Sequence, residues 1–253
     1  MHGRYASALV LATVVGAVAL AACDTVTAGA PQPEPATGTG TSQPAAAAAA
    51  TPLPTRASQA PVSVPASAWI SVDRIPQGTD QPWPDLAGRA EPLGKNTFWL
   101  YALCGATPSP LADGDHARAV VDYGDGRWSA EQVIVHYPGD PWTMGQTASA
   151  DFSALQDILT HCTPDAPGTT LQLTTPSGSP CPNTPRGGCH QVAAEIRSPK
   201  GQPVGHIYLA NVGSTVTELT VWATGTPVTP WAGTPDEDVF AAMNPQLCTV
   251  WEC

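Results

Sequence analysis

The sequence predicts an α+β domain that has a mainly antiparallel sheet, helices on one face and stapling disulfides. Three observations lead to this fold class. Several short segments alternate apolar and polar side chains, as half-buried strands do. Short turn sequences join most of these segments, which favours antiparallel pairing. One stretch has helical periodicity, and six cysteines beyond the N-terminal region can form disulfides.

The first half of the domain is predicted to contain three strands. Asn96–Cys104 (NTFWLYALC) is largely aromatic and apolar, and we interpret it as a buried strand. Ala117–Tyr123 and Trp128–Tyr137 follow as the two strands of a β-hairpin. Gly124-Asp125-Gly126 lies between them, and these residue types tolerate the positive φ angles of tight turns.

Ser149–Cys162 is the clearest predicted helix. Its apolar residues recur at helical spacing and make one face, namely Phe152, Leu155, Ile158, Leu159 and Cys162. Ser149 or Asp151 can cap the start, and Pro164 ends the helix. Because Cys162 lies on the apolar face, we expect it to be bonded to the sheet.

The second half is predicted to hold four more strands and a final helix. The strands are Thr169–Thr174, Gln191–Arg197, Val204–Asn211 and Thr215–Ala223. Pro176–Gly188 is interpreted as a loop because it is dense in proline and glycine. Asp236–Met243 is expected to be a short helix, since three acidic residues in its first turn suit the helix dipole.

The N-terminal segment is predicted to be an export signal. Leu9–Ala22 is apolar or small almost throughout, as in a secretory signal peptide. It ends in Leu20-Ala21-Ala22-Cys23, which resembles the lipobox of bacterial lipoproteins. That resemblance implies removal of residues 1–22 and lipidation of Cys23 with acyl chains such as palmitate, which would anchor the protein on the extracytoplasmic side of the cell membrane. The alternative is an ordinary signal peptide followed by an unmodified cysteine.

Residues 23–66 are predicted to be a tether. The segment is rich in Pro, Ala and Thr, includes the run Ala45–Ala50, and has almost no large apolar residue. Such a composition cannot bury enough apolar surface to offset the entropy lost on ordering. Residues 67–253 are therefore expected to form a single sensor-like α+β domain.

The charge and the composition of the chain limit the kinds of partner and of source organism that we expect. The chain has 10 Lys and Arg against 21 Asp and Glu, a formal net charge of −11, which argues against nucleic acid as a partner. Only two lysines occur, and Ala, Pro, Gly and Thr dominate, which suggests a high-GC genome such as that of an actinobacterium.

The cysteine count predicts three disulfides in an exported domain. The six cysteines after Cys23 are Cys104, Cys162, Cys181, Cys189, Cys248 and Cys253. The sequence alone leaves 15 connectivities open. We favour Cys104–Cys162, Cys181–Cys189 and Cys248–Cys253. Metal binding is not expected, because there is no CxxC pair and the histidines are scattered.

No catalytic residue or cofactor is assigned. There is no Gly-x-Ser-x-Gly elbow of the kind that presents a nucleophilic serine. His136 and Asp140 are interpreted as a strand residue and a turn residue. The acidic clusters Asp113/Asp115 and Asp122/Asp125 lie at predicted turns, where aspartate forms local hydrogen bonds.

Tryptophan is the candidate ligand-binding residue, since the chain has eight tryptophans against three phenylalanines. Trp83, Trp142 and Trp231 lie in segments that are rich in Pro or Gly rather than in periodic elements. A loop tryptophan can line a groove for a carbohydrate or peptide, because its flat face packs on rings and its N–H donates. The alternative is that these side chains pack over loops and disulfides.

Five stretches carry a resemblance to a known family. They are the aromatic stretch that ends at Cys104, Gln132–Tyr137, Phe152–Cys162 (ending LTHC), Ile207–Gly213 and Val216–Val221. With them the chain resembles the extracellular sensor-type domains of actinobacteria, which occur on PknH-like receptor kinases and on free-standing lipoproteins. The resemblance implies an α+β fold with disulfides and a cleft for an unidentified ligand. Because no kinase sequence is recognised, we expect the chain not to signal alone.

Three functions follow as hypotheses. The first is a binding or sensor-like module of the cell envelope, whose partner is a small molecule, a glycan or an envelope protein. It predicts an apolar or aromatic cleft without a convergent acid/base pair. The second is an envelope hydrolase acting on cell-wall polymers, which predicts a His or carboxylate with a shifted pKa deep in a cleft. The third is a structural or adhesive lipoprotein with no cleft.

Overall fold

The computed structural model describes residues 63–78, 80–93, 98–108, 114–175, 179–181 and 188–251. All of them belong to one compact unit, Arg56–Cys253. The expected signal peptide and Cys23 lie outside the described residues, as does most of the expected tether. The side chain of Val64 is only 4% exposed and belongs to the core, so packing begins slightly before residue 67.

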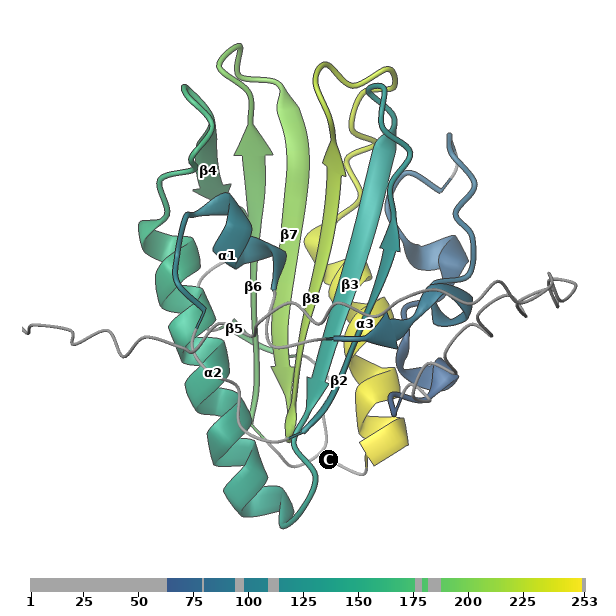
Figure 1. Cartoon of the computed structure of the whole chain (residues 1–253), viewed down its shortest axis with the longest axis vertical. Coiled ribbons are helices and arrows are strands. Elements are labelled where there is room, and N and C mark those ends of the chain that lie inside the picture. The colour runs from purple at the N-terminus through teal and green to yellow at the C-terminus, as the bar shows by residue number, and fades with distance from the viewer. Residues whose placement is uncertain are drawn as a thin grey trace, which may run out of the picture. The chain divides into compact units, whose positions relative to one another are not determined.

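An antiparallel sheet forms the centre of the domain (Figure 1). Its strand order is β1 (Glu91–Pro92), β2 (Asp115–Val121), β3 (Trp128–His136), β8 (Thr215–Ala223), β7 (Pro203–Val212), β6 (Cys189–Arg197) and β4 (Thr170–Leu173). A short strand, β5 (Ser179–Pro180), also pairs with β6. The predicted α+β class and antiparallel pairing are confirmed.

The helices cover both faces of the sheet, which corrects the expectation of helices on one face. One face packs against α1 (Trp99–Leu103) and α2 (Pro141–His161). The other packs against α3 (Asp236–Trp251) and the short 3₁₀ turns η1 (Ala66–Ala68) and η2 (Val72–Arg74), while η3 (Ala87–Arg89) lies near β2. The central strands are apolar on both sides and need two cover layers. On β7, Ile207 and Leu209 belong to the core under α2, whereas Tyr208 and Ala210 belong to the core under α3.

The β2–β3 hairpin is confirmed. Its strands pair in register from Asp115 opposite His136 to Val121 opposite Ala130. Asp125 in the turn has a φ of 51°, and the glycines on either side also have positive φ angles. The β7–β8 hairpin turns at Gly213, whose φ is 56°. Local turn chemistry therefore sets these connections, as expected.

The predicted strand Asn96–Cys104 is wrong where the structure describes it, because Trp99–Leu103 is the helix α1. An apolar run of this length fits a buried strand and a buried helical segment equally well. The decisive contact comes from β8, where the side chain of Glu218 accepts hydrogen bonds from the backbone N–H groups of Trp99 (2.7 Å) and Leu100 (3.4 Å). A carboxylate far away in the chain thus satisfies the free donors at the start of α1.

The helix α2 starts earlier than predicted. Asp140 is its N-cap, because Asp140 Oδ1 accepts a hydrogen bond from the backbone N–H of Thr143 (2.9 Å). Pro141 occupies the first turn, where its missing N–H costs nothing. Neither Ser149 nor Asp151 is the cap. The first turns of α2 carry few buried side chains, so they lack the apolar periodicity on which the prediction depended.

The last helix is also longer than predicted. α3 runs to Trp251 rather than ending at Met243, and it accommodates Pro245 in its interior. Its apolar residues pack into the core on the sheet face opposite α2. Among the described residues, we find no helix whose length and apolar character would allow it to cross a membrane.

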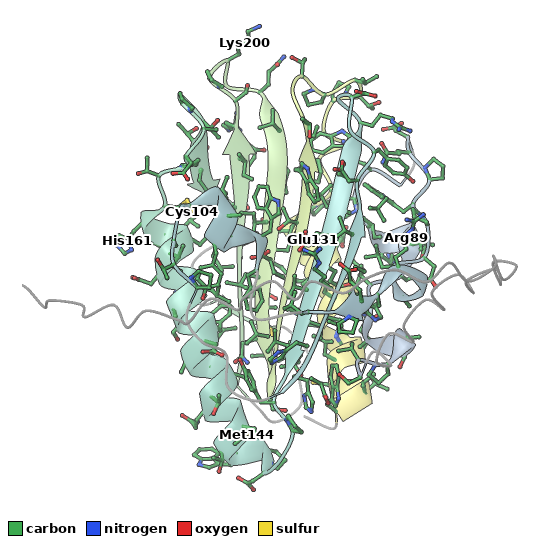
Figure 2. The ribbon with its side chains drawn as sticks, in the orientation of Figure 1. Arg89, Cys104, Glu131, Met144, His161 and Lys200 are labelled. Atoms are coloured by element: carbon green, nitrogen blue, oxygen red, sulfur yellow. A yellow bond between two sulfur atoms is a disulfide. The ribbon has the colours of Figure 1, made fainter. Side chains whose placement is uncertain are left out.

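Two of the expected disulfides are confirmed. Cys104–Cys162 (Cα–Cα 5.4 Å) joins the end of α1 to the end of α2, where Figure 2 labels Cys104 and the neighbouring His161. It therefore links two helices instead of a helix and the sheet. Cys181–Cys189 (Cα–Cα 5.3 Å) closes a loop next to β6. Cys248 is disulfide-bonded, and Cys253 lies outside the described residues.

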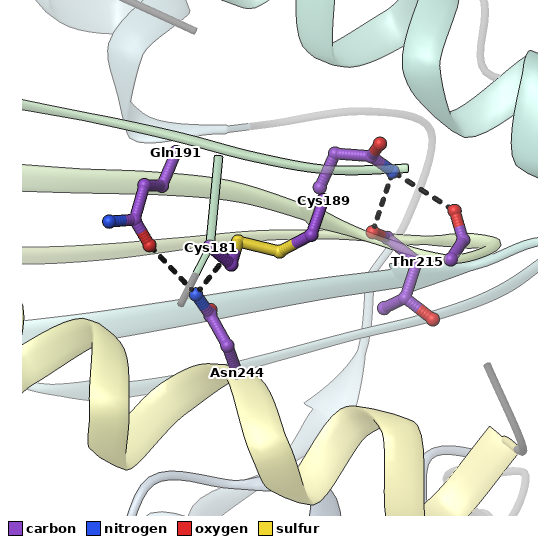
Figure 3. The surroundings of a disulfide bond; sticks show 7 residues. Cys181, Cys189, Gln191, Thr215 and Asn244 are labelled. Atoms are coloured by element: carbon purple, nitrogen blue, oxygen red, sulfur yellow. Dashed lines mark hydrogen bonds between the residues drawn. A yellow bond between two sulfur atoms is a disulfide. The ribbon is translucent and has the colours of Figure 1, made fainter. Parts of the chain in front are cut away.

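A side chain of α3 contacts the Cys181–Cys189 disulfide directly. The Nδ2 atom of Asn244 donates to Gln191 Oε1 (3.1 Å) and to Cys181 Sγ (3.4 Å), as Figure 3 shows. The disulfide thus takes part in packing α3 onto β6.

Candidate functional site

The connection between β8 and α3, residues 224–235, is held firmly against one end of the sheet. The indole N–H of Trp128 donates to the carbonyl of Thr229 (2.9 Å). The Nε2 atom of Gln77 donates to the carbonyl of Pro230 (2.9 Å), and the N–H of Val228 donates to the carbonyl of Gly126 (2.8 Å). Three separate segments therefore position this connection.

Trp231 of this connection stacks on a buried histidine. Its ring lies parallel to that of His206 on β7, with centroids 3.8 Å apart and an interplanar angle of 12°. Trp128 on β3 packs against it at an angle, with centroids 5.0 Å apart. His206 is only 4% exposed. Packing on both neighbours fixes the orientation of the Trp231 ring.

A polar cluster surrounds His206. Strand register places Glu195 of β6 opposite His206, and Glu195 Oε2 lies 3.5 Å from His206 Nε2. Arg197 forms an ion pair with Glu195. Tyr208 follows two residues after His206 on the same face of β7, and its ring is fully buried.

Several polar atoms of this cluster have no hydrogen-bond partner among the described residues. They are both ring nitrogens of His206, the hydroxyl of Tyr208 and Nε of Arg197. Buried polar groups in folded proteins almost always have a partner, so each exception needs an explanation.

The pKa values of His206 and Tyr208 are both shifted away from neutral pH. Burial, together with the nearby positive charge of Arg197, lowers the pKa of His206 to about 3. Burial, and next the negative charges of Asp236 and Glu195, raises the pKa of the Tyr208 hydroxyl above its usual value. A general acid or base works best with a pKa near the operating pH. The His206 and Tyr208 side chains are thus poorly suited to acid–base catalysis.

A hollow of about 130 Å³ lies beside Trp231. Its walls come from the β6–β7 hairpin and the β8–α3 connection, and they are formed by Gln202, Pro203, Thr226, Pro227, Pro230 and Trp231. Lys200, at the tip of the same hairpin, marks this end of the sheet in Figure 2. Pockets for drug-sized ligands measure about 300–1,000 Å³. The hollow therefore admits a single small group.

The three candidate tryptophans lie in different settings. Trp83 is buried, and its indole N–H donates to the carbonyl of Pro76 (2.8 Å), so it packs under a loop. Trp142 is 78% exposed at the start of α2, on the other side of the sheet from Trp231. Trp231 lines the hollow between the β6–β7 hairpin and the β8–α3 connection. The described residues do not bring the three side chains into one groove.

His136, Asp140 and Asp122 each have a structural role. His136 stacks on Trp251 with centroids 4.4 Å apart, and burial lowers its pKa. Asp140 caps α2. Asp122 accepts hydrogen bonds from the backbone N–H of Gly124 and the hydroxyl of Ser129, which confirms a turn role. Asp113 lies outside the described residues.

Sequence reasoning missed a pair of buried glutamates on the α1 face of the sheet. Glu218 of β8 is 1% exposed, and burial, then the negative charge of Glu131 on β3, raises its pKa to about 8. Burial also raises the pKa of Glu131. The sequence feature that could have indicated a buried carboxyl is the charged residue Glu218 within the β-rich segment TVTELTVWA. Since α1 covers Glu218 and uses both of its oxygens, we interpret this carboxyl as structural.

Within the described ranges, no group of three or more His, Cys, Asp or Glu side chains has an arrangement that could hold a metal ion. The comparisons with known proteins identify no relative. No protein-family model matches this chain, and no curated protein or solved structure does so at a significant level.

Proposed function

We propose that this protein is a lipid-anchored, extracytoplasmic binding or sensor-like module of the cell envelope, and that its ligand occupies the hollow at Trp231. The observation that carries the proposal is the way Trp231 is presented. Its ring is stacked on His206, packed by Trp128 and still forms a wall of the hollow. A rigid aromatic ring that lines a hollow suits the binding of a ligand.

The lining of the hollow favours a saccharide ring as the ligand. No charged side chain lines it. Trp231 and three prolines offer flat apolar surfaces that suit the C–H face of a sugar, and the amide of Gln202 and the hydroxyl of Thr226 can hydrogen-bond to sugar hydroxyls. A cell-envelope glycan would present such rings to a domain on the outer side of the membrane.

Replacing Trp231 with alanine should weaken saccharide binding at least about tenfold, because the stacking wall is lost. Titrations with glucose, galactose and N-acetylglucosamine, followed by NMR shifts of the backbone amides of Thr226, Val228 and Thr229, would measure this. Trp142→Ala is the matched control, since it removes an exposed tryptophan distant from the hollow. Trp231→Phe keeps an aromatic ring in case the alanine variant folds poorly.

Two results would count against this binding role. One is the absence of any saturable shift in the unmodified protein with all three sugars. The other is equal weakening by the Trp231→Ala and Trp142→Ala variants, which would mean that the sugars bind elsewhere.

The anchor depends on Cys23 and is tested separately. A Cys23→Ser variant should lose the acyl mass and the association with membranes, because the thiol is the expected site of the diacylglycerol. Intact-mass analysis of membrane-extracted and soluble fractions measures both. A Cys104→Ser/Cys162→Ser variant serves as the control and should keep the acyl mass. An unmodified mass for the native protein would show that the lipobox interpretation is wrong.

A further inference from the structure

The start of α2 presents an exposed apolar tip, residues 138–144. Trp142 is 78% exposed, more than any other large apolar side chain among the described residues. Pro138 and Pro141 are exposed as well, and Met144 is half-buried. The first buried residue of α2 is Ala148, so packing against the sheet begins two turns into the helix. Figure 1 shows that the first turns of α2 extend beyond the ends of the strands.

The tip carries a single charge, which is used inside the helix start. Asp140 is the one charged residue in the sequence from 138 to 150. Its Oδ1 atom accepts hydrogen bonds from the backbone N–H (2.9 Å) and the hydroxyl (2.8 Å) of Thr143, and these bonds hold the pKa of Asp140 below its usual value. The positive end of the helix dipole also favours this charge. The tip therefore suits an uncharged, partly apolar partner.

The predicted tether joins the domain at the same end of the sheet as the tip. Just after the tether, the carbonyl of Ala68 accepts a hydrogen bond from Nε2 of Gln246 on α3 (3.2 Å). From there α3 rises only about 7.5 Å to Trp251, since each helical residue adds about 1.5 Å. The ring of Trp251 stacks on that of His136, with centroids 4.4 Å apart. His136 ends β3, two residues before Pro138 at the start of the tip.

The hollow at Trp231 lies at the opposite end of the sheet. Trp128, at the start of β3, packs against Trp231, whereas His136 ends the same strand beside the tip. Eight residue steps of about 3.4 Å separate the two ends of this strand by roughly 27 Å. Figure 2 labels Lys200 and Met144 at these two ends of the molecule.

We propose that the tip rests in the headgroup region of the membrane, with Trp142 inserted at the interface and the hollow at Trp231 facing away from the bilayer. The proposed lipid anchor at Cys23 is a premise here, because it keeps the domain beside the membrane. Tryptophan prefers the membrane–water interface, where its apolar ring and its indole N–H are both accommodated. The tether enters at the tip end, so a short path to the membrane brings this end to the bilayer first.

The test couples the chain from Cys23 onward to phosphatidylcholine nanodiscs through a maleimide lipid at Cys23. This coupling replaces natural acylation, so a missing acyl group in the native protein would count against the anchor alone. Some of the lipids carry a nitroxide on the headgroup, which broadens the NMR signals of nearby nuclei. The reporters are the ¹⁵N indole N–H signals of Trp142 and Trp231 and the ¹³C methyl signal of Met144. A Trp142→Phe variant assigns the indole signal of Trp142.

We expect the nitroxide to broaden the Trp142 signal strongly and to leave the Trp231 signal sharp. In a Trp142→Ala variant most of the broadening at Met144 should disappear, because the tip is no longer held at the interface. Val228→Ala is the matched control, since Val228 is 71% exposed and belongs to the β8–α3 connection at the other end. This control should leave the broadening at Met144 unchanged. Both variants change exposed side chains, so both should fold.

Three results would overturn the proposal. Equal broadening of the Trp142 and Trp231 signals would mean that the domain has no preferred orientation on the membrane, and a sharp Trp142 signal would mean that the tip stays in water. An equal effect of the Trp142→Ala and Val228→Ala variants at Met144 would separate the broadening from the tip. A Trp142 signal that shifts with protein concentration in the absence of lipid would assign the tip to a contact between copies of this chain, which also contradicts a membrane contact.

Discussion

Removing the Cys104–Cys162 disulfide should lower the free energy of unfolding by about 4 kcal/mol. The double variant Cys104→Ser/Cys162→Ser achieves this with little change of volume. The disulfide closes a loop with a sequence separation of 58, and a cross-link of that length restricts the unfolded chain strongly. Because small domains are stable by only about 5–15 kcal/mol, the loss would be a large share of the total.

The Cys181–Cys189 disulfide is the internal comparison. Its sequence separation is 8, for which the same chain-entropy relation gives about 2.5 kcal/mol. Urea unfolding of both double serine variants, followed by far-ultraviolet circular dichroism, measures the two losses side by side. A larger loss for the short loop would show that local packing around Asn244, not loop length, decides how much each bond contributes.

The free energy of unfolding of the unmodified domain should fall by about 2 kcal/mol between pH 6.5 and pH 8 because of Glu218. A Glu218→Gln variant should not show this fall. The pKa of Glu218 rises from 4.5 to about 8 on folding, first because of burial and then because of Glu131. Between these values the folded state keeps a proton that the unfolded state has released. The stabilisation is therefore complete below about pH 4.5 and is lost as the pH rises through about 8.

The pH interval is chosen so that other groups do not obscure the effect. The pKa values of His136 and His206 are lowered on folding, so their contributions change mostly below about pH 6.5, with a smaller remainder just above it, and have the opposite sign. Glu131, whose pKa is raised, acts in the same direction as Glu218, and the charge of Arg118 counteracts its shift. These groups remain in the glutamine variant, so the difference between the two proteins isolates Glu218.

The measurement is urea unfolding of the unmodified protein and the Glu218→Gln variant at pH 6.5 and pH 8. Glutamine keeps a carbonyl oxygen that can accept from the first N–H groups of α1, so the helix retains a cap. Glu237→Gln, an exposed glutamate, should behave like the unmodified protein. Equal stability of the unmodified domain at both pH values would contradict the prediction, as would a variant that keeps the full pH dependence.

The elements that could be predicted are those whose signal is local. Alternation in Thr215–Ala223 marks a strand whatever lies beside it, and Gly124-Asp125-Gly126 forms a tight turn because of its own φ preferences. The Cys181–Cys189 pair was favoured because only a short loop separates the two residues. Trp231 was chosen as a loop tryptophan, and it lines a hollow. Trp83 carried the same local signal and is buried under a loop, so that signal does not separate binding from packing.

By itself the sequence determined the class of the fold and most of its strands, because each depends on residues that are close together in the chain. It left 15 pairings of the six cysteines open. Only the tertiary structure decided that Trp99–Leu103 is a helix, that helices cover both faces of the sheet and that Trp231 stacks on His206. These features depend on partners far apart in the sequence, such as Glu218 and Trp99, whose separation is 119 residues. A local pattern carries no information about which distant side chain will meet it when the chain folds.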